Sequence, residues 1–154
     1  MSEIQPRLTE SGLTLEKGEK VLTELRSDRA RYWRDHAMLA LLGMAGAGAV
    51  LWLLGSDHVA IGSLGAVLAL GVRGLYLASE QFKSVWVLTD RRLVLPGGRS
   101  VMLLEIETVR KLMGDMQIIT RAGDKHLIKH IADPDAAVAL IEQARTRRAK
   151  RVRD

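Results

Sequence analysis

Few residues in this 154-residue sequence have the types and spacing that chemistry requires. His126 and His130 fall on one face of a predicted strand and could ligate a metal, but no third ligand stands near them, so we interpret both as surface histidines. Asp90 directly precedes two arginines, where turn formation explains the carboxylate better than acid catalysis does. The sequence has no Cys, phosphate loop, nucleophile elbow or dinucleotide-binding fingerprint. We therefore expect a protein that is not an enzyme and uses no metal or cofactor.

The basic residues are the more distinctive group, with 23 Lys and Arg against 18 Asp and Glu. Nucleic-acid binding would explain this balance, but most of the positive charge adjoins long apolar segments, where membrane topology already explains it. Six of the last ten residues are Lys or Arg, so the tail either contacts anionic lipid headgroups or is simply solvated. No nucleic-acid partner is expected. The candidate lipid contacts are Arg29, Arg31, Arg34, Arg73, Arg91, Arg92, Arg145, Arg147, Arg148 and Lys150.

Two long apolar segments dominate the first half of the chain. Residues 37–55 contain no charge, and residues 59–79 are interrupted only by Arg73. Nineteen helical residues reach roughly 28 Å, close to the ~30 Å hydrocarbon core of a bilayer. We therefore expect a two-helix transmembrane hairpin within residues 36–79. Arg73 either snorkels to the nearby membrane surface or has a function inside the membrane.

The charges around this hairpin predict its orientation. Lys and Arg flank both of its ends, whereas the connecting loop at residues 56–58 has none. Because cytoplasmic segments carry the excess of Lys and Arg, both termini are expected in the cytoplasm. The first apolar segment also begins too late, and is too long, for a cleavable signal peptide. The sequence thus predicts a two-pass membrane protein.

Small residues recur at a spacing of about four in both apolar segments. This spacing lets helix backbones approach closely, either within a tight hairpin or against another membrane protein. The candidate helix–helix contacts are Gly43, Gly46, Ala47, Gly62 and Ala66.

The rest of the chain alternates apolar and polar residues. Residues 20–26 predict a strand, with a helix as the competing interpretation. After Ser84 the pattern predicts an antiparallel meander, with residues 107–112 continuing or following the strand before them. Asp133 as N-cap, followed by Pro134, predicts a final helix that covers the sheet with its apolar stripe. The expected fold class is α+β. The strands of the meander are expected at 85–89, 93–95, 101–106, 107–112, 116–121 and 125–131.

Four sequence motifs resemble those of the bacterial pleckstrin-homology-like (PH-like) membrane proteins. They are KGEKVL at 17–22, WVLTDRRLV at 86–94, GDMQIIT at 114–120 and Asp133-Pro134, and the resemblance covers residues 13–150. It implies a strongly bent, seven-stranded antiparallel sheet or barrel, capped by the C-terminal helix, with the membrane hairpin inserted after the first strand. It also implies the bacterial inner membrane, and scaffolding or assembly more than chemistry. The short turns at 96–100 and 112–115 depart from the family pattern and argue against a deep ligand pocket.

These expectations divide the chain into five parts. A flexible tail at 1–12 is followed by the first strand and juxtamembrane segment at 13–35, and by the hairpin at 36–79. The remainder of the PH-like domain covers 80–150, and a basic tail end covers 151–154.

Two functions fit this organisation. The first is an accessory subunit or assembly factor of an inner-membrane complex, whose partner is another integral membrane protein. The second is a lipid- or envelope-sensing module that docks on anionic headgroups through Arg91, Arg92 and the basic tail. A homo-oligomer is left open.

Overall fold

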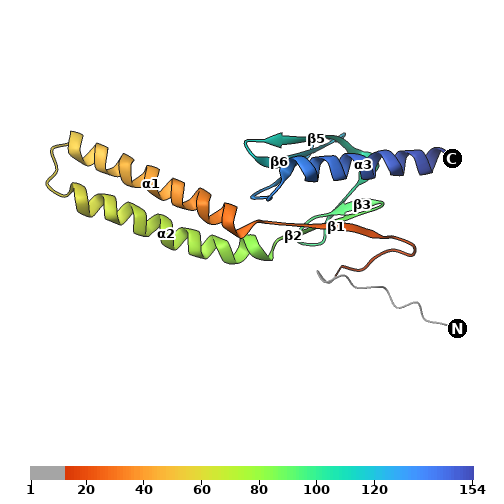
Figure 1. Cartoon of the computed structure of the whole chain (residues 1–154), viewed down its shortest axis with the longest axis horizontal. Coiled ribbons are helices and arrows are strands. Elements are labelled where there is room, and N and C mark those ends of the chain that lie inside the picture. The colour runs from red at the N-terminus through yellow and green to blue at the C-terminus, as the bar shows by residue number, and fades with distance from the viewer. Residues whose placement is uncertain (1–12) are drawn as a thin grey trace. The chain divides into compact units, whose positions relative to one another are not determined.

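The computed structural model describes residues 13–154, and the predicted N-terminal tail at 1–12 lies outside the described residues. The chain forms two compact units. Residues 28–83 form a helical unit, and residues 13–27 together with 84–154 form what we call the α+β unit. Figure 1 shows the order of the elements, in which strand β1 precedes the two long helices and all other strands follow them. The predicted α+β class is confirmed.

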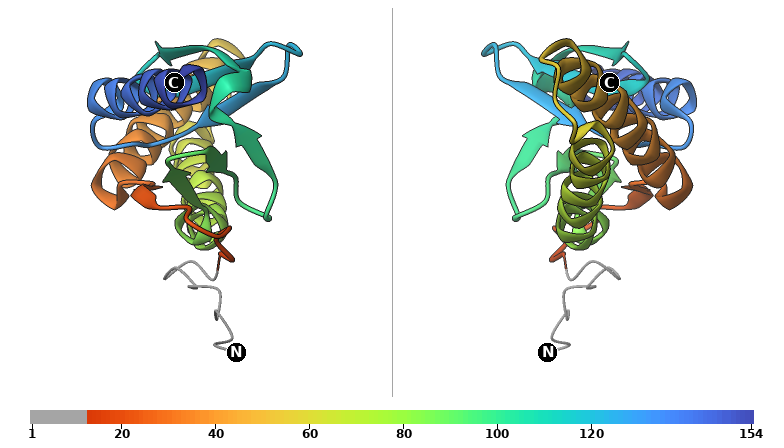
Figure 2. Two further views of the ribbon diagram at one scale, coloured as in Figure 1. Left: turned by 90° about the vertical axis from the view of Figure 1, so that its right-hand side faces the viewer. Right: turned by 90° about the vertical axis from the view of Figure 1, so that its left-hand side faces the viewer.

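The helical unit consists of α1 (Arg29–Leu53) and α2 (Val59–Lys83), which pack side by side (Figure 2). Asp28 caps α1 by accepting a hydrogen bond from the Arg31 amide at 2.7 Å. Both helices are long and apolar enough to cross a membrane. Each extends beyond its apolar segment, because charged residues continue the helix at the Arg29 end of α1 and at the Lys83 end of α2.

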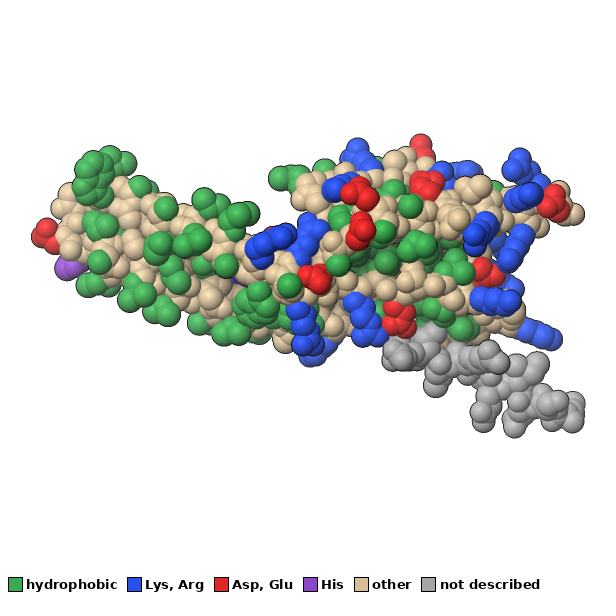
Figure 3. Space-filling model, viewed as in Figure 1, with side chains coloured by type: hydrophobic (Ala, Val, Ile, Leu, Met, Phe, Trp, Pro, Cys, Tyr) green, Lys and Arg blue, Asp and Glu red, His purple; other side chains and the backbone are tan. Residues whose placement is uncertain are grey.

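Large apolar side chains cover the outside of the helical unit (Figure 3). Leu42, Trp52 and Val72 are 66, 72 and 67% exposed. The core helix of a soluble protein buries such residues, and soluble monomers rarely expose a contiguous apolar surface of this extent. The helical unit is therefore apolar on its outside as well as between its helices.

The α+β unit contains seven strands in two antiparallel sheets. The first sheet has the order β1-β2-β3-β4, built from Val21–Arg26, Val85–Thr89, Arg92–Val94 and Ser100–Met102. The second has the order β5-β6-β7, built from Ile106–Leu112, Asp115–Thr120 and Lys125–Ile128. A short 3-10 helix, η1 (Leu103–Glu105), joins the sheets, and helix α3 (Pro134–Arg153) ends the chain.

The strand predicted before the hairpin is confirmed as β1. It pairs with β2, so that Leu25 lies opposite Trp86 and Arg26 opposite Val85. The chain leaves this strand pair at Ser27 and returns to it at Ser84. Both links to the helical unit therefore start from one end of the α+β unit, which we call the connection end.

The strand predicted over 101–106 is wrong in its middle, whereas residues 101, 102 and 106 do lie in strands. Its residues 103–105 form η1, which buries Leu103 completely and carries the chain from one sheet to the other. The apolar residues of this segment fit a strand by alternation alone, but here they fill the space between two sheets. The described residues therefore form two sheets with no closed barrel, instead of one continuous meander.

The last predicted strand, 125–131, ends early at Ile128. His130 adopts a left-handed backbone conformation with φ of 56°, and its amide donates a hydrogen bond to Asp115 Oδ1 at 2.9 Å. This change of direction breaks the two-residue alternation. In an unbroken strand, alternation would place Ile131 on the same face as the exposed Leu127, but Ile131 is buried.

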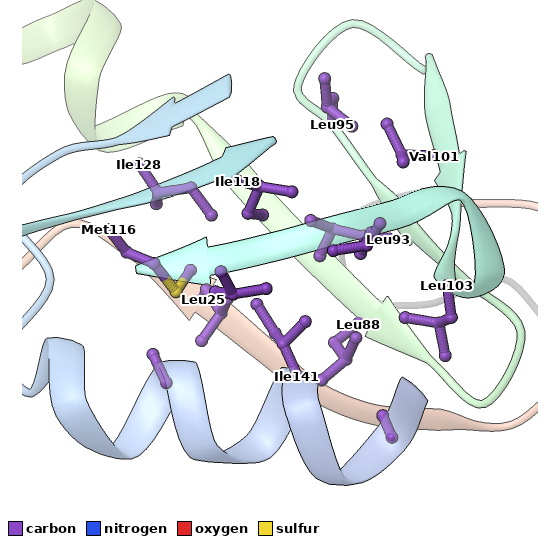
Figure 4. Close-up of a cluster of buried hydrophobic side chains, with 14 of the residues drawn as sticks. Leu25, Leu88, Leu93, Leu95, Val101, Leu103, Met116, Ile118, Ile128 and Ile141 are labelled. Carbon is purple, nitrogen blue, oxygen red and sulfur yellow. The ribbon is translucent and has the colours of Figure 1, made fainter. Parts of the chain in front are cut away.

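The core of the α+β unit lies between the sheets and α3 (Figure 4). Leu88 and Leu93 from the first sheet meet Met116 and Ile118 from the second, and Ile141 of α3 packs against both sets. The predicted start of α3 is confirmed, because Asp133 Oδ1 accepts from the Ala136 amide at 2.9 Å and Pro134 opens the helix. The helix continues to Arg153, so most of the basic tail end is helical.

Candidate functional site: the arginine-lined end of the α+β unit

A buried carboxylate fixes the turn between β2 and β3. The Glu19 side chain is fully buried and accepts hydrogen bonds from Arg92 Nε at 2.9 Å and Arg92 Nη2 at 3.0 Å. The Thr89 hydroxyl donates to Glu19 Oε1 at 2.7 Å and accepts from the Arg92 amide at 3.0 Å. Two parallel bonds from a guanidinium to a carboxylate are among the strongest hydrogen bonds in proteins. The network therefore joins the segment before β1 to the turn after β2.

Burial and hydrogen bonding shift the pKa of Glu19 in opposite directions. Desolvation alone would raise the pKa of this carboxyl, but the hydrogen bonds from Arg92, the Glu16–Glu19 turn and Thr89 outweigh it and hold the pKa below its usual value. The pKa of Arg92 is raised by its hydrogen bond to Glu19. Both groups are therefore charged at neutral pH.

Gly18 makes the turn before Glu19 possible, because its φ of 78° favours a residue without Cβ.

The other residues of the Thr89–Arg92 turn are held as well. Asp90 Oδ1 accepts from the Lys20 amide at 2.9 Å, and Asp90 Oδ2 pairs with Arg151 Nη1 at 3.2 Å. Arg91 pairs with Glu16 at 3.2 Å. The carboxylate of Asp90 thus forms part of a turn, as the sequence predicted, and two of the predicted lipid contacts, Arg91 and Arg92, already have carboxylate partners.

The arginines of α3 differ in their contacts. Arg145 Nη1 donates to the Glu107 carbonyl at 2.7 Å and the Ile106 carbonyl at 3.2 Å, and Arg145 Nη2 pairs with Glu142 at 2.7 Å. Within residues 13–154, by contrast, one group of basic side chains has no hydrogen-bond or ion-pair partner. This group comprises Arg121, Arg147, Arg148, Lys150 and Arg153.

Two hollows lie beside these free arginines, on either side of Leu104 of η1. The larger has a volume of about 420 Å³ and is lined by Leu104, Ile106, Glu107, Arg121, Arg145, Thr146, Ala149 and Arg153. The smaller has a volume of about 240 Å³ and is lined by Glu16, Arg91, Arg92, Met102, Leu104 and Arg148. Each hollow therefore has three arginines and one glutamate in its lining. We call the two hollows and their lining the arginine-lined end.

This end lies opposite the connection end. The Arg151–Asp90 pair sits just beyond the last residue of β2, whereas Ser84 precedes its first. A five-residue strand spans about 16 Å, which separates the two ends. At the connection end, the Ser27 hydroxyl instead donates to the Lys129 carbonyl at 3.2 Å. The free arginines are therefore distant from both links to the helical unit.

The basic residues of the helical unit gather around an aromatic cluster. Tyr32 is buried, donates its hydroxyl to the Gly74 carbonyl at 2.7 Å and stacks on His36 at 4.1 Å. Phe82 packs edge-on against Tyr32 at 5.1 Å, and the Arg29 guanidinium lies 5.2 Å from the Phe82 ring centroid. The predicted lipid contacts on α1, Arg29, Arg31 and Arg34, therefore lie in its first two turns. Arg73, the neighbour of Gly74, is exposed at the same level of the hairpin.

The small residues fall into two groups. A Cβ at Gly43 would meet Leu70, and a Cβ at Gly62 would meet Leu51, so both glycines permit the close approach of α1 and α2. Gly46 has open space instead. Ala47 and Ala66 are half-buried. Gly43 and Gly62 thus lie at the contact between α1 and α2.

Sequence reasoning missed two contributors to the arginine-lined end. Glu19 had no assigned role, because its partner Arg92 lies 73 positions away along the chain. Arg121 was passed over because it stands alone after β6, outside any basic cluster. For the two histidines, no group of three or more potential metal ligands forms within the described residues.

No family model, curated protein or solved structure matches this chain.

Proposed function

We propose that this protein is a non-enzymatic, membrane-anchored interaction module that presents its arginine-lined end to an acidic segment of a partner protein. The observation that carries the proposal is the larger hollow, where Arg121 and Arg153 lack carboxylate partners among the described residues and lie far from the connection end. In this role the chain is an accessory subunit or assembly factor of an inner-membrane complex.

The helical unit supports the membrane anchor. Its helices of 25 residues each have exposed apolar side chains, and a bilayer is the solvent in which such a surface is stable. The aromatic cluster and Arg73 lie at one level of the hairpin, as expected at a headgroup boundary. Because Lys and Arg flank this level and the loop at 54–58 has none, we place both termini in the cytoplasm.

The order of elements supports a PH-like assignment for the α+β unit. Seven antiparallel strands are followed by one helix, and the long helices are inserted between β1 and β2. This is the order that the sequence resemblance implied. Such a domain needs no catalytic residue, and we assign none.

Two features favour a protein segment over the bilayer as the ligand of the arginine-lined end. Arg91 and Arg92, which would reach for lipid phosphates, are already paired with Glu16 and Glu19. The larger hollow is also concave and combines arginines with Leu104 and Ala149. Arginine forks bind carboxylates in pairs of hydrogen bonds, and an apolar floor accommodates neighbouring side chains. An acidic peptide that also carries apolar residues matches both properties.

Charge reversal in the larger hollow tests the proposal. In Arg121→Glu/Arg153→Glu, two free positive charges of the hollow become negative, so a partner bound through carboxylates should be lost on co-purification of the full chain in mild detergent. Arg147→Glu is the control, because Arg147 lies on the same helix as Arg153, has no partner within residues 13–154 and lines neither hollow. Equal retention of the partner by both variants would refute the proposal.

A second measurement separates the partner from the bilayer. The full chain, labelled at Thr146→Cys in the larger hollow, is placed in nanodiscs of neutral or anionic lipid with headgroup quenchers. The proposal predicts no quenching in either lipid. Quenching in anionic lipid alone would assign the arginine-lined end to lipid binding.

A further inference from the structure

The turn between β5 and β6 exposes two apolar residues. Met113 is 98% exposed and Leu112, the last residue of β5, is 38% exposed. Leu112 pairs with Asp115, so the turn consists of Met113 and Gly114 alone. We call residues 112–115 the apolar turn.

Neither packing nor backbone geometry explains Met113. Its φ is 50° and that of Gly114 is 89°, so both central residues are left-handed, as in the tight hairpin turns that favour Asn-Gly. Cβ crowding disfavours a residue such as Met in this conformation. An exposed side chain that also strains its turn points to a function outside the fold of the unit.

The apolar turn lies at the connection end of the α+β unit. The carboxylate of Asp115 accepts from the His130 amide at 2.9 Å, and the neighbouring Lys129 carbonyl accepts from the Ser27 hydroxyl at 3.2 Å. The opposite end of β6, at Thr120, leads into the turn before β7. The β5–β6 strand pair therefore places Met113 at the end of the unit from which the chain continues into α1.

The links at this end are short. Only residues 27 and 28 separate β1 from α1, and only residue 84 separates α2 from β2. Two extended residues span about 7 Å, so the chain passes from the connection end into an apolar helix within that length. If those helices cross a bilayer, exposed side chains at the connection end are within reach of its headgroup layer.

The charges beside the apolar turn suit such a surface. Arg110 donates to the neutral side chain of Gln117 and keeps its charge, and the Lys129 side chain has no partner within residues 13–154. Lys111 pairs with Asp135 at 2.7 Å. Apolar residues between basic ones are typical of segments that insert into the membrane interface.

We infer that Leu112 and Met113 insert into the interfacial layer of the membrane and hold the connection end of the α+β unit against it. This inference rests on the membrane anchor in the proposed function, but not on the partner of the arginine-lined end. The contact is apolar, so it should form with neutral and anionic lipids alike.

A single introduced thiol tests the inference, because the sequence contains no Cys. The full chain carrying Met113→Cys is labelled with an environment-sensitive fluorophore and placed in phosphatidylcholine nanodiscs that contain lipid-borne quenchers. Ala122→Cys is the control, since Ala122 is exposed in the turn at the other end of β6. We expect blue-shifted, quenched emission at residue 113 and neither effect at residue 122. Equal spectra at the two positions would overturn the inference.

A label at residue 129, next to the turn, tests the same contact without modifying residue 113. Lys129→Cys is exposed beside the turn and should also be quenched by lipid. Adding Met113→Asn, which suits the left-handed turn but is polar, should reduce that quenching. Undiminished quenching would contradict a role for Met113.

The outcomes also separate the two proposals. A chain that does not enter nanodiscs would overturn both the membrane anchor and the inserted turn. If residue 113 is quenched but Arg121→Glu/Arg153→Glu changes the binding of no partner, the inserted turn is supported and the acidic-segment ligand is rejected.

Discussion

The two ends of the α+β unit expose different groups, because one exposes positive charges and the other an apolar turn. At the arginine-lined end a buried carboxylate, Glu19, neutralises one arginine and fixes a turn, while Arg153 has no ion-pair partner among residues 13–154. At the connection end single hydrogen bonds hold the backbone, and Met113 is almost fully exposed. One end therefore uses a polar network to display positive charge, and the other displays an apolar turn.

The difference shows where each end can bind. A displayed charge without a partner attracts an anion and is weakened by salt, whereas a displayed apolar side chain is stabilised by lipid or by an apolar surface and is insensitive to salt. The two ends of one small domain can thus bind two different surfaces at once. Substitutions at one end should therefore leave the binding of the other end unchanged.

The largest effect is expected from Glu19→Ala. Removing the carboxylate leaves Arg92 largely buried without its charge partner, which should lower the free energy of unfolding by about 3 kcal/mol. Arg91→Ala breaks an exposed pair in the same turn and should cost under about 1 kcal/mol. Urea unfolding of the full chain in detergent measures both, followed by Trp86 emission with Trp33 and Trp52 replaced by Phe. Similar losses in the two variants would show that the Glu19 pair does not fix this end.

The pH dependence of stability sharpens the same point. The pKa of Glu19 is lower in the folded chain than its usual value of 4.5, so the unfolded chain binds the proton more readily. The stabilisation is therefore present above about pH 4.5 and is lost as the pH falls through the lower, folded pKa. Glu19→Gln cannot titrate and should show a flatter stability profile below pH 4.5. A profile as steep as that of the unsubstituted chain would assign the acid sensitivity to other carboxylates.

The elements with regular periodicity could be predicted from the sequence. The long helices, β1 and the start of α3 follow from uninterrupted apolar runs, alternation and the Asp133-Pro134 cap. Residues 103–105 could not be predicted as η1, because their apolar character is the same whether they continue a strand or turn between sheets. Likewise the end of β7 depends on a left-handed His130, which the alternating pattern does not reveal.

Of the candidate site, only the clustered basic residues could be predicted from the sequence. The charges of the C-terminal segment are visible in the sequence, but which of them are free depends on carboxylates and carbonyls brought together by folding. Arg145 is held by carbonyl groups of residues 106 and 107, some 38 positions earlier in the chain. The larger hollow likewise combines η1, the start of β5, the residue after β6 and α3, which no local pattern relates.

At the connection end, Met113→Asn should raise the stability of the α+β unit. Asn tolerates the left-handed backbone that Met113 adopts, and relief of this strain contributes about 0.5–1 kcal/mol. The fully exposed side chain loses no packing in the exchange. The same urea titration in detergent measures the gain, and Met113→Leu serves as the control because Leu is apolar and tolerates the left-handed backbone no better than Met. A loss of stability in Met113→Asn would mean that Met113 packs within the unit.

The smallest effect is expected from Arg151→Ala, which probes the outermost contact of the arginine-lined end. Its guanidinium pairs with Asp90 at 3.2 Å, but the Arg151 side chain is largely exposed, and such pairs contribute about 0–1 kcal/mol. Asp90 also accepts from the Lys20 amide, so Asp90→Ala removes a turn contact as well and should be more destabilising than Arg151→Ala. Urea titrations at low and high salt separate the two contributions, because only the exposed ion pair is screened. If Arg151→Ala proved as harmful as Glu19→Ala, the end of α3 would be part of the polar network, and the hollows beside it would be rigid features of the fold instead of a surface left open for a partner.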